Sequence, residues 1–130
     1  GKTVIRQINS SIFKYDQWVD IFSIHSVMGH TTINHILHTC SNYKWILIGE
    51  MSTSDTLMNA EYLSSSVTIY ESNKNIIGMV CQHHTNNNVI HLVPGISNIK
   101  IQNDDQCYKP PKERLFADFF IVGRSIDEFI

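Results

Sequence analysis

A short apolar stretch that ends in glycine and arginine is the part of this sequence best suited to chemistry. Residues 117–122 predict a buried strand, and Gly123 and Arg124 follow it directly. Glycine has no Cβ, so an oxyanion can approach the backbone N–H groups, and arginine offers a planar fork for two charge-assisted hydrogen bonds. In a parallel α/β barrel, a ligand phosphate usually lies at the loops after the last two strands. The pattern predicts a phosphate site; the alternative is a strand that ends in a turn with a surface arginine.

Other segments repeat the pattern of an apolar strand that stops at a polar or turn residue. Residues 89–95 run Val-Ile-His-Leu-Val-Pro-Gly, and the loop after them carries Gln106 and Tyr108. Residues 47–52 run Leu-Ile-Gly-Glu-Met-Ser. With the first stretch, they place polar groups after several strands, which is where parallel α/β proteins bind ligands.

These landmarks resemble the orotidine 5′-monophosphate decarboxylase family. A strand ending in Pro-Gly, a loop with Gln-x-Tyr and a strand ending in Ile-Val-Gly-Arg are similar to its last two strand–helix units. Residues 47–52 resemble its fifth strand, residues 13–25 the approach to its fourth strand, and residues 1–4, Gly-Lys-Thr-Val, the opening of its third helix. The landmarks occur in family order across nearly the whole chain, which makes the set far more specific than any one member.

The resemblance implies a phosphate grip near the end of the chain. Gln106, Tyr108 and Arg124, with the backbone of Gly123, would hold a 5′-phosphate. The loop Ile96–Lys109 would act as a lid that closes over it and excludes water. On its residues alone, Tyr108 could equally be an ordinary surface or interface aromatic.

The resemblance also implies contacts to the base and the ribose. Ser52 would hydrogen-bond the pyrimidine amide edge, although serine is also a common turn residue. Pro94 would line the base pocket. Thr3 would reach the ribose in the neighbouring subunit of a homodimer.

The activity that the resemblance implies is decarboxylation of orotidine 5′-monophosphate to UMP, the last step of de novo pyrimidine nucleotide biosynthesis, without a metal or cofactor. The family's catalytic lysine and Asp-x-Lys-x-x-Asp motif would lie upstream of Gly1, so we expect no catalytic residue in this chain and no activity from it alone. The full-length parent would be a free-standing decarboxylase or the decarboxylase domain of a bifunctional UMP synthase. Alternatives are a non-catalytic relative that binds phosphate and acts as a binding or interaction protein, and a sugar-phosphate decarboxylase or aldolase on the same barrel.

The elements that must position these residues alternate between strands and helices. Continuous apolar runs, typical of parallel strands buried on both faces, predict strands at Val19–Ile24, Trp45–Glu50, Ile76–Val80, Val89–Val93 and Phe119–Val122. Helices are predicted at Thr31–His38 and Asn59–Glu71, with Asp55 or Asn59 as the cap of the second. The polar stretch 83–88 is too short for a crossover helix. The fold class is therefore α/β, an incomplete (β/α)8 TIM barrel from roughly helix 3 to strand 8, and residues 1–130 form one partial domain that lacks the first three strands and the last helix.

Composition excludes several other classes of protein. A hydrophobic fraction of 42% is enough for a real core, and a formal charge of −2 provides no electrostatic footprint for nucleic acid or an anionic membrane. No apolar run reaches the roughly 18–20 residues of a spanning helix. Three widely spaced cysteines argue against a disulfide framework and favour a reducing, cytoplasmic setting. The seven histidines lack the spacing of a zinc site, so we expect no metal, and His25 is assigned a structural role.

Overall fold

The protein is described from a computed structural model, which covers residues 1–102, 107–123 and 126–130. Its centre is a five-stranded sheet in which every strand is parallel to its neighbours and pairs with the next strand of the sheet along the chain. The strands, in spatial order, are β1 (Ile21–His25), β2 (Lys44–Ile48), β3 (Ile76–Val80), β4 (His91–Val93) and β7 (Phe119–Phe120). Because all are parallel and in chain order, their carboxyl ends meet along one edge, as in a segment of a parallel barrel.

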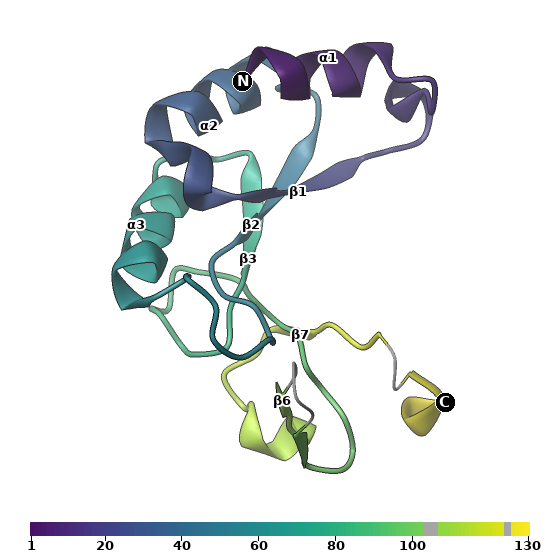
Figure 1. Cartoon of the computed structure of the whole chain (residues 1–130), viewed down its shortest axis with the longest axis vertical. Coiled ribbons are helices and arrows are strands. Elements are labelled where there is room, and N and C mark those ends of the chain that lie inside the picture. The colour runs from purple at the N-terminus through teal and green to yellow at the C-terminus, as the bar shows by residue number, and fades with distance from the viewer. Residues whose placement is uncertain (103–106, 124–125) are drawn as a thin grey trace.

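Three helices cover the convex face of this sheet, and the opposite face is open (Figure 1). They are α1 (Lys2–Ser10), α2 (Gly29–Thr39) and α3 (Ala60–Glu71). Short 3-10 turns are η1 (Tyr15–Gln17), η2 (Ser26–Met28), η3 (Pro111–Glu113) and η4 (Ile126–Phe129). Of the two predicted caps for α3, the structure selects Asn59, whose Oδ1 accepts a hydrogen bond from the Tyr62 backbone N–H at 2.9 Å.

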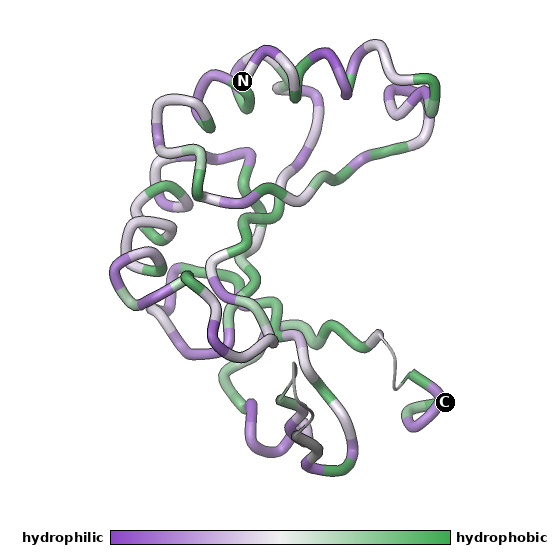
Figure 2. Tube along the Cα trace, viewed as in Figure 1, coloured by the Kyte–Doolittle hydropathy of each residue, from purple (hydrophilic) through white to green (hydrophobic). Residues whose placement is uncertain are grey.

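Alternation along the strands divides the apolar residues between the two faces. Trp45 and Leu47 of β2 are buried in the cluster that also contains Ile33 and Ile36 of α2 and Ile69 of α3. Successive side chains of a strand point to opposite faces, so Ile46 and Ile48 lie on the open face. Figure 2 shows the hydrophobic residues concentrated along the strands. The packed core therefore lies between the sheet and the helices.

The prediction that every strand is buried on both faces is wrong, because one face of the sheet is open, and the exposure is greatest at the two edge strands. Ile21 of β1 is 47% exposed, and Phe119 and Phe120 of β7 are 63% and 42% exposed. β1 and β7 each have one neighbour in the sheet, and no described segment covers the open face beside them. A closed barrel would bury the apolar side chains of these strands. The sheet formed here is open, so these side chains remain exposed.

The connections near the carboxyl edge follow the prediction in outline. Residues 81–90, which join β3 to β4, contain no helix. The predicted lid contains an antiparallel pair, β5 (Ile101–Gln102) with β6 (Cys107–Tyr108). Pro111 then begins η3. Within the described part of the chain, no helix is long and apolar enough to span a bilayer.

Candidate functional site

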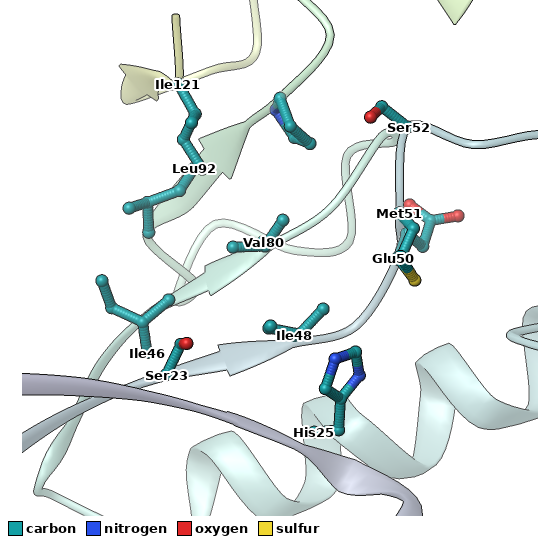
Figure 3. A pocket seen from close by; sticks show the side chains of 11 residues that line it. Ser23, His25, Ile46, Ile48, Glu50, Met51, Ser52, Val80, Leu92 and Ile121 are labelled. Atoms are coloured by element: carbon teal, nitrogen blue, oxygen red, sulfur yellow. The ribbon is translucent and has the colours of Figure 1, made fainter. Parts of the chain in front are cut away.

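A cavity of about 360 Å³ opens on the uncovered face of the sheet (Figure 3). Its lining includes the polar Ser52, just beyond β2, and the apolar Pro94, just beyond β4, so the structure brings together two of the predicted site residues. Its apolar walls come from four strands or their carboxyl-terminal extensions: Ile46, Ile48, Val80, Leu92 and Ile121. A mostly apolar cavity with a few polar groups at strand ends is the usual form of a small-molecule site in a parallel barrel.

Gly95 allows the predicted lid to dock on the strand ends. The Cys107 N–H donates to the Ser52 carbonyl at 3.2 Å, and the Lys109 N–H donates to the Gly95 carbonyl at 2.9 Å. Gly95 has a φ of +72°, and a Cβ there would lie 2.9 Å from the Cys107 carbonyl oxygen and 3.1 Å from the Ser52 Cβ. Only glycine accommodates both the backbone conformation and the close approach. β6, which carries Tyr108, is thereby held against Ser52.

Glu50 fixes the ends of β2 and β3 relative to each other. Its Oε2 accepts hydrogen bonds from the backbone N–H groups of Gln82, at 2.6 Å, and His83, at 3.1 Å. Its Oε1 lies 2.9 Å from His83 Nδ1. Because a carboxylate only accepts, Nδ1 carries the proton in this contact. Sequence reasoning used Glu50 as a landmark but assigned it no contact.

Arg114 connects the segment after the lid to the ends of β3 and β4. Its guanidinium donates from Nη1 to the Gln82 backbone carbonyl and from Nη2 to Gln82 Oε1 at 2.6 Å. Gln82 Nε2 in turn donates to the Pro94 carbonyl at 3.4 Å. Arg114 is only 5% exposed, and sequence reasoning missed it. Arg114 follows two prolines, so no hydrophobic periodicity indicates that it is buried. Its partner, Gln82, lies 32 positions away in the sequence.

The remaining predicted site residues either do not line the cavity or lie outside the described residues. Thr3 is exposed on α1 and lines neither this cavity nor the neighbouring one described below. Gly123 is exposed after β7, and nothing lies within 4 Å of where its Cβ would be. Gln106 and Arg124 lie outside the described residues. The structure therefore brings together Ser52 and Pro94, with the strand of Tyr108 docked on them.

The three cysteines are unpaired. Cys81 follows β3, and burial, reinforced by the negative charges of Glu50 and Asp118 and partly offset by Arg114, raises the pKa of its thiol to about 12. Burial also raises the pKa of the Cys40 thiol. Thiols held protonated in this way are poor nucleophiles and poor metal ligands. Among the described residues, no group of three or more His, Cys, Asp or Glu side chains could hold a metal ion.

Comparison with known proteins gives one consistent result. The family model described as "Orotidine 5′-phosphate decarboxylase / HUMPS family" matches residues 1–128. An orotidine 5′-phosphate decarboxylase of Mucor circinelloides f. lusitanicus is 29% identical over 137 residues, which cover 97% of this chain and 52% of that protein. The same enzyme of Phycomyces blakesleeanus is 28% identical over 137 residues, with 97% and 51% covered. A uridine 5′-monophosphate synthase of Bos taurus is 28% identical over 140 residues, with 97% and 28% covered. The chain thus spans about half the length of these decarboxylases and less of the synthase.

Proposed function

Because this chain belongs to the orotidine 5′-phosphate decarboxylase / HUMPS family, we propose that its full-length parent decarboxylates orotidine 5′-monophosphate to UMP. The observation that best supports this proposal is the meeting of Ser52 and Pro94 in one apolar cavity, with β6 hydrogen-bonded to Ser52. This arrangement suits a flat, partly polar ring with a charged group attached to it. The chain would supply residues that bind the nucleotide, and the catalytic lysine and aspartates would belong to the upstream part of the parent.

The pyrimidine would occupy the cavity at the carboxyl edge. The Ser52 hydroxyl would hydrogen-bond the amide edge of the base, and Pro94 would pack against the ring. In the closed barrel of the parent, the apolar walls would exclude water, which would strengthen any electrostatic interaction that the upstream residues make with the reacting carbon. When the carboxylate leaves as CO2, the electron pair stays on that carbon until the upstream lysine supplies a proton.

The 5′-phosphate would be held at the far end of the nucleotide by Gln106, Tyr108, Arg124 and the backbone N–H of Gly123. The exposed position of Gly123, with nothing within 4 Å of where a Cβ would lie, is compatible with the approach of an oxyanion. Phosphate contacts that form fully only when Ile96–Lys109 closes would contribute to the transition state more than to the first encounter complex. Remote binding energy would then lower the barrier at the reacting carbon.

Two further features belong to the proposal. The parent would be a homodimer in which Thr3 reaches the ribose of the neighbouring site, and the exposure of Thr3, away from its own chain's cavity, supports that role. It would work in the cytoplasm without a metal or cofactor. The three free cysteines are in keeping with a reducing compartment.

The decisive experiment removes the guanidinium of Arg124, which we propose binds the phosphate. In the full-length parent, Arg124→Ala should weaken UMP binding by roughly 2–4 kcal/mol, the range for loss of a charge-assisted contact to a buried anion. The loss for free uridine should be much smaller. The matched control is Lys112→Ala, which removes an exposed cation from η3 and should leave both affinities unchanged. Equal losses for UMP and uridine would show that Arg124 does not bind the phosphate.

A further inference from the structure

A second cavity, of about 250 Å³, adjoins the first and shares Ser52 with it. We call it the polar cavity; the lining residues that matter here are Ser52, Thr53, Thr56, Cys107, Lys109 and Arg114. Successive side chains of a strand point to opposite faces, so Cys107 and Lys109 lie on one side of β6 and Tyr108 on the other. Tyr108 does not line the polar cavity. The polar cavity therefore lies on the opposite side of β6 from Tyr108.

The polar cavity contains the buried positive charge of Arg114, which has no ion-pair partner among the described residues. A guanidinium has five N–H donors, of which Arg114 uses one on Nη1 and one on Nη2, both toward the neutral Gln82. Its Nε is buried without a hydrogen-bond partner. No carboxylate of the described residues lies within 4.0 Å of its guanidinium nitrogens. A buried charge is costly unless an opposite charge and further hydrogen bonds compensate for it, so this environment favours an anion.

Glu50, the acidic residue in the wall, does not supply that compensation. Its two oxygens already accept from two backbone N–H groups and from His83 Nδ1. The donors in the lining include the Lys109 ammonium and the hydroxyls of Ser52, Thr53 and Thr56. Thr56 Oγ1 accepts from the Met58 N–H at 3.3 Å, which leaves its own O–H available to donate. A volume of about 250 Å³ is several times the roughly 30 Å³ that one water molecule occupies, so a tetrahedral anion fits.

We propose that the polar cavity is a second anion site, which binds a tetrahedral oxyanion, either free phosphate or the phosphate group of an ester, between Arg114 and Lys109. The anion would neutralise Arg114 and accept hydrogen bonds from Lys109 and the threonine hydroxyls. It would also hold β6 against the end of β2, because Ser52 and Cys107 line the cavity and are hydrogen-bonded to each other.

The test is a calorimetric titration of the full-length parent, saturated with UMP, with inorganic phosphate. We expect one phosphate per chain with a Kd on the order of 1 mM. Lys109→Ala should weaken it at least about tenfold, the equivalent of one charge-assisted contact. The backbone bonds of Lys109 to Gly95 and Ser97 survive this change. Arg114→Met should abolish binding, and the exposed Lys112→Ala is the matched control that should change nothing.

The experiment distinguishes the two sources of the anion, and it distinguishes failure of the second site from failure of the proposed function. Two UMP molecules per chain indicate the phosphate of an ester, and one UMP plus one phosphate indicates free phosphate; both support the site. If Arg114→Met does not fold, Lys109→Ala and Thr56→Val carry the test. If only one UMP binds per chain, no phosphate binding up to about 10 mM, some ten times the expected Kd, overturns the proposal. Binding of phosphate or of a second UMP that is unaffected by Lys109→Ala overturns it too. If the parent binds no UMP, the proposed function fails, and the same phosphate titration on ligand-free protein carrying Arg124→Ala still decides the second site.

Discussion

The substitution Gly95→Ala tests whether the lid is held against the nucleotide site as described. The new methyl group would sit 2.9 Å from the Cys107 carbonyl oxygen, a backbone atom that cannot rotate away. A φ of +72° adds about 1–2 kcal/mol of strain for an L-residue. Overpacking adds about 1–3 kcal/mol. The free energy of unfolding should therefore fall by about 2–5 kcal/mol.

Gly29→Ala is the matched control for backbone strain. Gly29 has a φ of +78°, but nothing lies within 4 Å of the position of its Cβ. Its substitution should cost about 1–3 kcal/mol of stability through strain alone. Gly29 begins α2 and lines neither cavity, so it leaves Ser52 and β6 in place.

The two variants are compared in the full-length parent by urea unfolding and by kcat/KM for orotidine 5′-monophosphate. Gly95→Ala should lower kcat/KM by about 10- to 100-fold, because displacement of Cys107 moves β6 away from Ser52, and misplacement of a binding group by about 1 Å can cost 100-fold. Gly29→Ala should leave kcat/KM within about threefold, since Gly29 lines neither cavity. The reasoning is refuted if both variants lose kcat/KM equally, or if Gly95→Ala loses none.

Three further outcomes are expected. In the full-length parent, Gln106→Ala combined with Tyr108→Phe should reduce kcat/KM for the nucleotide by about 10²- to 10⁴-fold while turnover of orotidine stays near normal; comparable losses on both substrates would indicate misfolding. Asn59→Ala should lower the free energy of unfolding in urea by about 1 kcal/mol through loss of the bond to the Tyr62 N–H, and an unchanged midpoint would contradict that cap. Burial raises the pKa of the Cys81 thiol from 9.0 to about 12, so the contribution of this thiol to stability is complete below pH 9.0 and is lost as the pH rises toward 12. Cys81→Ala should remove that part of the pH dependence of the free energy of unfolding. The same fall in stability with pH in the variant would refute this expectation.

The order and type of the elements could be predicted because their signals are local. The apolar run Trp45–Glu50 predicts a strand that the structure places at Lys44–Ile48, and Ile76–Val80 has the predicted bounds. The start of α3 depends on the amide of Asn59 reaching a backbone N–H three positions later, which a local pattern can reveal. Burial could not be predicted in the same way. Ile21 and Phe119 have core-like sequences but lie on open edges, because exposure depends on what covers the sheet.

Of the residues that line the candidate site, the sequence indicated those that directly follow a predicted strand. Ser52 and Pro94 follow such strands, and they meet because parallel strands in chain order bring their carboxyl ends together. The bonds that hold these ends in place join distant parts of the chain, such as Arg114 to Gln82, and no sequence periodicity marks them. Gly95 was used as part of a turn signal, but its packing against Cys107 depends on a tertiary approach that only the structure reveals.

The central claim is that this chain provides the nucleotide grip of an active decarboxylase. It is tested most directly by supplying the full-length parent with orotidine 5′-monophosphate labelled in the carboxyl carbon and measuring released label together with UMP. We expect stoichiometric release of labelled CO2 and UMP in the presence of a metal chelator, at a rate that falls when Ser52 is changed to Ala. Tight binding of the nucleotide with no release of label would contradict the claim and identify the parent as a binding protein.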